Sequence, residues 1–309
     1  MQHIDFDTVH RLAGVASLVE PLRCAFGSSA ASPQRAHYDL ATPGKPGTLL
    51  LMPAWRESDL GIKIVTVFPD NATRGLPSVN AAYLLLSGQT GESRAWIDGR
   101  ALTLLRTAAV SALAADLLAP AAPEVLLVVG TGALSRYFVE GHLAVRKYRS
   151  VLIWGRDPSK AAAVVRDLDA RGWPVGVAAD LETAARAADV ISCVTLAEQP
   201  LIQGAWLKAA CHLDLVGSFR PSMREVDDDC LRGAVIAVDT RAALEESGDL
   251  IGPLERGVVA QGDIALLGEL IASRASGPRQ LKTVFKSVGV ALADLAVAAH
   301  LFERHAHGA

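Results

Sequence analysis

The chain has 309 residues, half of them hydrophobic, so it is long enough to bury a large core and to form two domains. A net charge of −3 gives no electrostatic basis for binding nucleic acid or an anionic membrane. No basic segment followed by an apolar one opens the chain, and no apolar run reaches the roughly 20 residues that span a bilayer, so we expect a soluble, cytoplasmic protein without a signal peptide. The cysteines lack C-x-x-C spacing and are expected to be reduced thiols in the core rather than disulfides or zinc ligands. They are Cys24, Cys193, Cys211 and Cys230.

The first part of the chain has the pattern of an antiparallel or mixed sheet combined with helices. Residues 5–27 have a helical period, and Pro21 is expected to break or bend the second part of this helix. A loop rich in Ser, Pro and Gly follows, with a short strand expected at 37–40, before four strand-like runs separated by turn signals. These runs cover residues 48–52, 61–68, 78–87 and 94–97. A long helix is expected over residues 100–118.

From residue 124 onward strands alternate with helices, which is the pattern of a doubly wound sheet. The expected strands are residues 125–129, 151–154, 174–178, 190–194, 213–216 and 234–238. A last helix, over about 288–305, follows the sheet and is expected to return to the first domain. We therefore predict an α/β protein with a Rossmann-type dinucleotide-binding domain at 120–289. A smaller α+β domain is predicted from residues 1–119 and 290–309.

The first strand of this sheet leads into a glycine turn. The sequence GTGALS at 130–135 precedes a helical pattern, and Gly130, Gly132 and Ser135 match the small positions of G-x-G-x-x-G/A. Gly130 allows a tight turn, and Gly132 lets backbone approach a pyrophosphate because it has no Cβ. The helix amino terminus adds unpaired N–H groups and a partial positive charge. For the motif alone, an ordinary β–α turn is the alternative.

The second strand ends where a residue that contacts the ribose is expected, about 20–25 residues after the glycines. NAD sites usually have a carboxylate at this strand end, but here Gly155 and Arg156 follow the strand, with Ser159 and Lys160 close behind. A guanidinium, a hydroxyl and an ammonium suit a 2′-phosphate, so we predict NADP, with NAD as the alternative. Asp157, which precedes a proline, is interpreted as a helix N-cap.

Three cations of the first part are candidates for binding a carboxylate. Lys63 lies in the apolar run GIKIVTVF and is either a solubilising charge on an edge strand or a ligand group. Arg106 lies among leucines and alanines, and we expect it to point into a cleft because an unpaired buried guanidinium is costly. Arg35 is less distinctive by itself. Together these cations can hold a substrate carboxylate beside a nicotinamide.

The chain resembles the ornithine cyclodeaminase/mu-crystallin family over nearly its whole length. The resemblance is carried by Arg35, LMPAW (51–55), GIKIVTVFPDN (61–71), LPS (76–78), DGRALTLLRTAAVSALAA (98–115), GTGALS (130–135), WGRDPSKA (154–161) and FKSVG (285–289). It implies a homodimer built through the first domain, an active site between the domains and a small amino-acid-like carboxylate as substrate.

The resemblance also implies roles for individual residues. Arg35, Lys63 and Arg106 are expected to bind the substrate carboxylate, with Lys63 and Arg106 as the catalytic residues. Ser78 is expected near the substrate, and Thr107 and Ser287 near the nicotinamide. The candidate cofactor-binding residues are Thr107, Gly130, Gly132, Ala133, Leu134, Ser135, Arg156, Ser159, Lys160 and Ser287.

Two positions depart from the cyclodeaminase pattern. Ornithine cyclodeaminases have an aspartate in a VGAD-x-P-like segment, and here Phe219 takes its place in VGSFRP (216–221). They also have a glutamate before the LMP-like motif, where Leu50 stands here. Phenylalanine cannot accept a proton or pair with an ammonium. The segment is instead similar to the branch that reduces cyclic ketimines, and an apolar wall from Phe219 would suit the ring of a cyclic imine.

The expected function is therefore NAD(P)H-dependent reduction of a cyclic ketimine carboxylate, such as Δ1-pyrroline-2-carboxylate or Δ1-piperideine-2-carboxylate, to a cyclic amino acid. The alternatives are ornithine cyclodeaminase, a related amino-acid dehydrogenase, and a non-catalytic binding protein like mu-crystallin. Lys63 or a bound water is the candidate proton donor. Residues 227–229, all aspartates, are interpreted as a solvated helix start, and no metal is expected.

Overall fold

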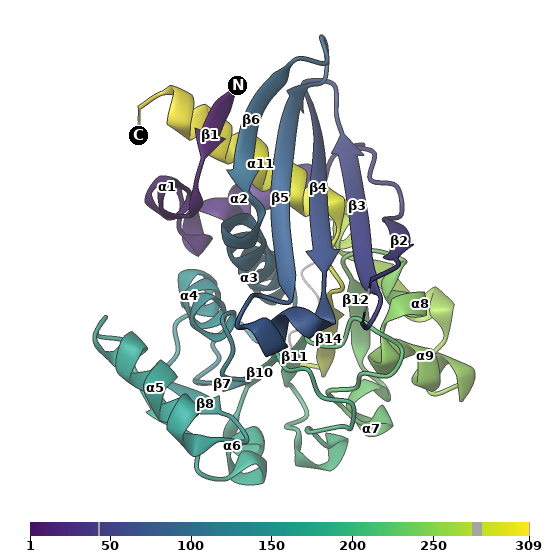
Figure 1. Cartoon of the computed structure of the whole chain (residues 1–309). Helices are drawn as coiled ribbons and strands as arrows, with labels where there is room; N and C mark the ends of the chain where they lie inside the picture. Colours follow the sequence, from purple (N-terminus) through teal and green to yellow (C-terminus); the bar gives the residue numbers. More distant parts are fainter. Residues whose placement is uncertain (43, 274–279, 309) are drawn as a thin grey trace. The chain divides into compact units, whose positions relative to one another are not determined.

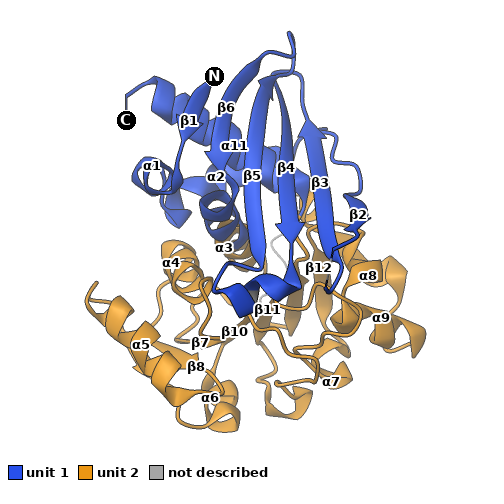
Figure 2. Cartoon of the chain, in the orientation of Figure 1, with its two compact units in different colours: residues 1–107, 290–309 blue, residues 108–289 orange. Residues whose placement is uncertain are grey.

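The computed structural model describes residues 1–42, 44–273 and 280–308, and the chain divides into two compact units (Figures 1 and 2). Unit 1 comprises Met1–Thr107 and Val290–Ala309, and unit 2 comprises Ala108–Gly289. Each unit is built on its own sheet, of six strands in unit 1 and eight in unit 2.

The sheet of unit 1 is mixed, as predicted. Its strand order is β1-β6-β5-β4-β3-β2, with antiparallel neighbours except for β1, which pairs parallel to β6. The strands are β1 (Gln2–Ile4), β2 (Ala36–Leu40), β3 (Gly47–Trp55), β4 (Asp59–Val67), β5 (Val79–Ser87) and β6 (Ser93–Asp98). The sequence pattern did not indicate β1, because three residues are too few to show a period.

Helices cover one face of this sheet. The C-terminal helix α11 (Ala291–Ala306) packs against β3, β4 and β5 and against α2 (Figure 1). Met52, Lys63 and Tyr83 are paired across these three strands and are buried, since their side chains share the covered face. The remaining helices of this part are α1 (Phe6–Leu12), α2 (Val15–Phe26), the 3-10 helix η1 (Pro69–Arg74) and α3 (Gly99–Leu118), which continues into unit 2.

The first helical segment breaks at a different place from the one predicted. Ala13 and Gly14 have extended backbone, which ends α1 and begins α2, whereas Pro21 lies inside α2. The low helix propensity of glycine accounts for a break at this point. Cys24 faces outward from α2 and is exposed, so placing it in the core was wrong. Cys193, Cys211 and Cys230 are buried free thiols.

Unit 2 is a doubly wound parallel sheet, which confirms the predicted α/β fold class. The strand order is β13-β12-β14-β11-β10-β7-β8-β9, and every neighbouring pair is parallel. The strands are β7 (Val125–Val129), β8 (Ser150–Trp154), β9 (Val175–Val177), β10 (Val190–Cys193), β11 (His212–Leu215), β12 (Val235–Val238), β13 (Ile264–Leu266) and β14 (Thr283–Lys286). The six predicted strands are present, and β13 and β14 are additional.

Both faces of this sheet are covered. In β7, Leu127 and Val129 belong to one hydrophobic cluster, while Leu126 and Val128 belong to another on the opposite face. This is why every residue of the strand is apolar. The helices of unit 2 are α4 (Ser135–Val145), α5 (Pro158–Asp169), α6 (Leu181–Ala187), η2 (Gly204–Trp206), α7 (Asp228–Leu231), α8 (Ala243–Glu246), α9 (Gly248–Glu255), η3 (Gln261–Asp263) and α10 (Leu267–Ala272).

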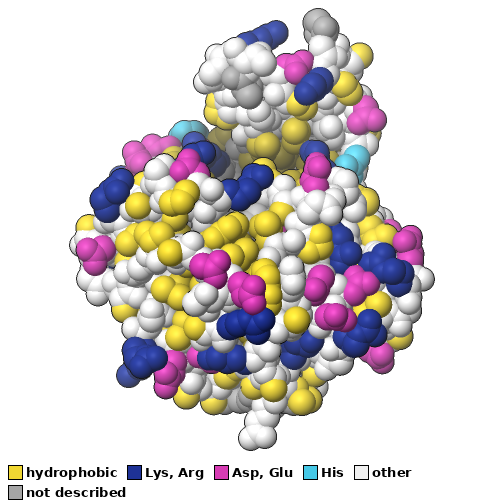
Figure 3. All heavy atoms as spheres, turned by 90° about the horizontal axis from the view of Figure 1, so that it is seen from below, with side chains coloured by type: hydrophobic (Ala, Val, Ile, Leu, Met, Phe, Trp, Pro, Cys, Tyr) yellow, Lys and Arg dark blue, Asp and Glu magenta, His cyan; other side chains and the backbone are white. Residues whose placement is uncertain are grey.

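Helix α3 is the one helix in the described part of the chain that is long and apolar enough to cross a membrane by length and composition. Its most apolar stretch is 83% buried inside the protein, which is also the pattern of a core helix. Charged side chains of both signs are interspersed over the face drawn in Figure 3. Exposed ion pairs of the described chain include Arg186 with Glu182 and Arg232 with Asp229.

Candidate functional site

Two of the predicted cations bind one carboxylate inside unit 1. The Nζ atom of Lys63 lies 2.8 Å from Oδ2 of Asp294, and Nε of Arg106 lies 3.0 Å from Oδ1. Asp294, on α11, is completely buried, and the two cations are nearly so. Because β4 pairs with a strand on each side, Lys63 is not the solubilising charge of an edge strand.

Arg35 is the third cation of this cluster. Arg35 immediately precedes β2, and β2 pairs with β3. In β3, Met52 is the residue opposite Lys63. Burial is the largest cause that lowers the pKa of Lys63 to about 8. The positive charges of Arg106 and Arg35 lower this pKa further, whereas Asp294 opposes them. Lys63 and Arg106 together carry two positive charges against the one carboxylate of Asp294, so an anion can be accommodated beside them.

Tyr83 completes the buried face beside Lys63. Its hydroxyl has no hydrogen-bond partner among the described residues, and a Cβ atom on Gly61 would lie 2.0 Å from that oxygen. Burial, followed by the charges of Asp294 and Asp59, raises the pKa of Tyr83, so the phenol stays neutral. Glycine at position 61 is therefore needed to admit the tyrosine two residues from Lys63.

Ser78 and Thr107, both predicted to contact ligands, make hydrogen bonds within unit 1. The carbonyl of Ser78 accepts a hydrogen bond from the N–H of Phe68, five residues beyond Lys63. At roughly 3.3 Å per residue the backbone of Ser78 lies on the order of 16 Å along the strand from that of Lys63. Thr107 is buried next to Arg106, and its Oγ1 donates to the carbonyl of Thr103 at 2.6 Å.

The glycine turn of unit 2 is built as its sequence predicts. Gly130 has a φ of 134°, and a Cβ there would lie 2.8 Å from the carbonyl oxygen of Val194. The buried Ser135 donates from Oγ to the carbonyl of Gly130 at 2.8 Å. No atom of the described residues lies within 4 Å of a Cβ added at Gly132, and Leu134, the N-cap of α4, provides no side-chain cap.

These features suit a dinucleotide diphosphate. From β7 the chain adds β8 and β9 on one side, and β10 and β11 lie on the other, so the turn is at the switch point of the sheet. Ligands of open parallel sheets bind at the carboxyl ends of strands beside such a point. The open space over Gly132, the exposed Ala133 and the uncapped amino terminus of α4 provide room and N–H donors for phosphates.

The end of β8 presents the residues predicted to select the cofactor. Arg156, Ser159 and Lys160 are exposed, and Arg156 has no hydrogen bond or ion pair with any part of the chain that is described. Asp157 accepts hydrogen bonds from the backbone N–H of Ser159 at 2.9 Å and from its Oγ at 2.6 Å. These bonds confirm Asp157 as the N-cap of α5. The Ser159 hydroxyl, predicted to bind the cofactor, donates its hydrogen bond to Asp157 in this structure.

Ser287, predicted near the nicotinamide, is fixed by a carboxylate from a neighbouring strand. Its Oγ donates to Asp239, which directly follows β12, at 2.7 Å. The N–H groups of Val288 and Gly289 donate to the same carboxylate at 3.2 and 2.7 Å. Asp239 thereby shapes the segment after β14.

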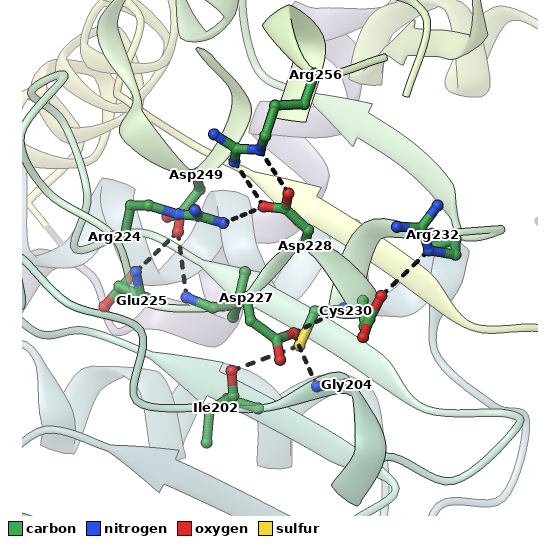
Figure 4. A network of polar contacts seen from close by, with 12 residues as sticks. Ile202, Gly204, Arg224, Glu225, Asp227, Asp228, Cys230, Arg232, Asp249 and Arg256 are labelled. Atoms are coloured by element: carbon green, nitrogen blue, oxygen red, sulfur yellow. Dashed lines mark hydrogen bonds and ion pairs between the residues drawn. The ribbon is translucent and has the colours of Figure 1, made fainter. Parts of the chain in front are cut away.

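A second buried charge cluster contains Glu225 and Asp249, which are drawn in Figure 4, and Lys286. The carboxylate of Glu225 accepts hydrogen bonds from the N–H and Oγ1 of Thr195, at 2.8 and 2.9 Å, and from the N–H of Gly217 at 2.8 Å. Asp249 accepts from the N–H of Glu225 at 2.8 Å, and its other oxygen lies 3.3 Å from Nζ of Lys286. All three charged side chains are completely buried.

Comparison with known proteins places the chain in a family. The profile of the Ornithine cyclodeaminase/mu-crystallin family matches residues 6–309. The chain belongs to this family. The Δ1-pyrroline-2-carboxylate reductase of Colwellia psychrerythraea is 35% identical over 312 residues, covering 97% of this chain and 98% of that protein.

Two solved structures share this fold. The Δ1-pyrroline-2-carboxylate reductase of Thermococcus litoralis, in complex with NADH and L-proline, has a TM-score of 0.91 at 28% identity and covers 100% of this chain and 98% of its own. An archaeal alanine dehydrogenase dimer with bound NAD has a TM-score of 0.91 at 26% identity, covering 100% and 97%. The predicted family, fold class and enzymatic nature are thus confirmed.

The segment that departs from the cyclodeaminase pattern lies partly at the surface. Phe219 is 42% exposed, and its ring centre lies 5.6 Å from the guanidinium carbon of Arg220. Asp227 accepts from the N–H of Cys230 at the start of α7, which confirms the interpretation of residues 227–229 as a helix start (Figure 4). Within the described ranges no group of three or more His, Cys, Asp or Glu side chains is arranged to hold a metal ion.

Several residues of these clusters were not predicted from the sequence. Asp294 carries the same signal as Arg106, because it is a single charge in the apolar helix ALADLAVAA. Lys286 likewise follows apolar residues in VFKSVG. Glu225 and Asp249 lie in polar segments, where a carboxylate does not stand out.

Proposed function

We propose that the chain is an NAD(P)H-dependent reductase of cyclic ketimine carboxylates, such as Δ1-pyrroline-2-carboxylate and Δ1-piperideine-2-carboxylate. The observation that carries this proposal is the charge count in unit 1, where Lys63 and Arg106 share the single carboxylate of Asp294. A substrate carboxylate would complete the pairing of these buried cations. The resemblance to reductases of this kind supports the same substrate class.

Each cation then has a distinct task. Arg106 and Arg35 hold the carboxylate through the fixed donor geometry of their guanidinium groups. Lys63, with a pKa of about 8, can release a proton to the substrate nitrogen near neutral pH. When bound, the nicotinamide supplies the hydride that adds to the imine carbon. Hydride and proton together convert the C=N bond into a secondary amine, and the carboxylate is unchanged.

We propose NADP as the preferred nicotinamide cofactor. Arg156 and Lys160 are exposed after β8, and no carboxylate other than the N-cap Asp157 directly follows that strand. The guanidinium of Arg156 is suited to a 2′-phosphate. The relatives with NADH or NAD bound keep NAD as the alternative.

A second candidate is an amino-acid dehydrogenase, which the likeness to an alanine dehydrogenase favours. Three parallel assays separate the candidates: NADPH with Δ1-pyrroline-2-carboxylate, NAD+ with L-alanine, and NAD+ with L-ornithine. We expect loss of the nicotinamide absorbance in the first. NADH formation with alanine would favour the dehydrogenase. Ammonia release from ornithine without NADPH oxidation in the first assay would establish a cyclodeaminase.

We also propose that the protein is a homodimer through the uncovered face of the unit 1 sheet. A row of apolar side chains crosses four strands on this face and is only half-buried within the chain: Pro53, Ile62, Leu84 and Trp96. Such a contiguous apolar surface is typical of a protein interface. Light scattering should give the mass of a dimer, and Leu84→Glu should shift it towards the monomer. A monomeric wild-type protein would refute this proposal.

A further inference from the structure

We propose that Glu225 is a positioning residue for the nucleotide, because its carboxylate joins the two loops that follow β10 and β11. The inference rests on the proposed binding of a nicotinamide nucleotide to unit 2. Glu225 itself is completely buried. It acts through the backbone that it holds.

The two loops meet at this carboxylate. Thr195 donates to it from its N–H and Oγ1, and Gly217 donates from its N–H. A Cβ atom on Gly217 would lie 1.9 Å from the carbonyl oxygen of Thr195 and 2.3 Å from Oε1 of Glu225. Only glycine therefore permits this approach, and the carboxylate is the common acceptor that fixes both loops.

The first of these loops forms one side of the glycine turn. Val194, the residue before Thr195, donates to the carbonyl of Val129 at 2.9 Å, and its own carbonyl lies against Gly130. Glu225 therefore fixes Thr195, and through it the backbone that packs on the turn at the switch point. Loosening the carboxylate should displace backbone at the place where a dinucleotide binds.

The charges around Glu225 make this contact sensitive to protonation. The one buried cation of this cluster, Lys286, pairs with Asp249. The groups that donate hydrogen bonds to Glu225, from Thr195 and Gly217, are neutral. Burial is the largest cause that raises the pKa of Glu225 to about 7; Asp249 also raises it, and Lys286 lowers it.

The remaining titratable neighbour, the buried thiol of Cys193, has a raised pKa and stays neutral. A protonated carboxyl group offers fewer acceptor positions than a carboxylate. Nucleotide affinity should therefore fall as the pH decreases through about 7.

The test is the dissociation constant of NADPH and NADH, followed by nucleotide fluorescence between about pH 6 and pH 8. Wild-type protein should bind several-fold more weakly at the lower pH. Glu225→Gln places an amide N–H₂ against one of the backbone donors, and should weaken binding by roughly tenfold at the higher pH and remove most of the pH dependence.

Asp189→Asn is the matched control. Asp189 also accepts from two backbone N–H groups, those of Glu124 and Val125, but at the amino ends of the strands. This variant should lower the melting temperature without changing nucleotide affinity or its pH dependence. Thr195→Val removes the Oγ1 donor to Glu225, together with the weak acceptor for the N–H of Ala197 at 3.3 Å, and keeps the backbone N–H donor, so it should give a smaller loss of affinity than Glu225→Gln.

Wild-type affinity and pH dependence in a folded Glu225→Gln variant would overturn the inference. If that variant does not fold, the inference is overturned when Thr195→Val binds normally and the wild-type affinity is constant across this pH range. Absence of nucleotide binding by the wild-type protein would instead refute the proposed function, and this inference with it.

Discussion

The two buried charge clusters have opposite composition. In unit 1, Lys63 and Arg106 share the single carboxylate of Asp294, so positive charge is in excess. In unit 2, Lys286 pairs with Asp249 while Glu225 is a second buried carboxylate, so negative charge is in excess. The side chains of these six residues are all buried, whereas Arg35, beside the cluster of unit 1, is partly exposed.

The difference lies in how the excess charge is satisfied. Glu225 accepts three hydrogen bonds from its own chain, so its charge is compensated by the fold. Among the described ion pairs, Lys63 and Arg106 have Asp294 as their one carboxylate partner. A buried charge that is compensated by hydrogen bonds from the same chain indicates a structural role. A buried charge that has no such compensation indicates a site for a ligand of opposite charge.

The largest expected effect is on stability when Asp294 is replaced. Asp294→Asn leaves two buried cations without a carboxylate, and we expect the free energy of unfolding to fall by about 3–5 kcal/mol. Asp59 is the matched control, because it also binds two cations, Arg56 at 2.7 Å and Arg94 at 2.9 Å. Those arginines are partly exposed, so Asp59→Asn should cost about 1 kcal/mol. Urea unfolding measures both, and equal losses would remove the distinction between the two carboxylates.

The second effect is on catalysis. Arg106→Ala should lower kcat/KM for Δ1-pyrroline-2-carboxylate. The expected loss of transition-state stabilisation is about 1.5–3 kcal/mol, the contribution of a charged hydrogen bond. Arg94→Ala removes a guanidinium that binds Asp59 instead and should leave kcat/KM unchanged. Similar losses in both variants would show that the effect is not specific to the cluster around Asp294.

The fold class was predictable because it depends on local patterns. The buried strand 125–129, its glycine turn and the following helix are contiguous in the sequence, and so are the strands between residues 47 and 98. The missed strands β1 and β13 have three residues each, too few to show a period, whereas β14 has four, as many as the predicted strands β10, β11 and β12, so its length does not explain why it was missed. Pro21 was expected to break or bend the helix, but it lies inside α2. The helical segment is interrupted instead at Ala13 and Gly14.

The site was only half predictable. Lys63 and Arg106 stand out as charges in apolar runs, but no local pattern shows that residue 294 folds back onto residue 63. Glu225 was missed because it lies in a polar segment, and its role depends on two loops that only the sheet order brings together. Contacts that are distant in the sequence are therefore what the structure adds.

The pH dependence gives a finer test of the positive cluster. Burial and the neighbouring arginines lower the pKa of Lys63 to about 8, so its protonated form is present below that pH and is lost above it. We expect kcat/KM to fall as the pH rises through about 8. Lys63→Arg keeps the charge but cannot release a proton, so it should lower the rate and abolish this alkaline decline. A decline with the same midpoint in both proteins would assign it to another group or to the substrate.

The smallest expected effect concerns cofactor choice. Arg156→Ala should weaken NADPH binding by roughly tenfold and leave NADH binding unchanged, because only NADPH has a 2′-phosphate for the guanidinium. Arg166→Ala removes another exposed arginine, on α5, and should change neither constant. An unchanged preference for NADPH in Arg156→Ala would exclude Arg156 as the phosphate-binding residue.

The most direct measurement compares L-proline with L-prolinamide as inhibitors of Δ1-pyrroline-2-carboxylate reduction. The two molecules share the ring and the amine and differ in the carboxylate that Lys63, Arg106 and Arg35 are proposed to bind. We predict that prolinamide inhibits at least about tenfold more weakly, as expected for the loss of a charged hydrogen bond. Equal inhibition by the two compounds, or inhibition by neither, would contradict the binding of a substrate carboxylate by this cluster.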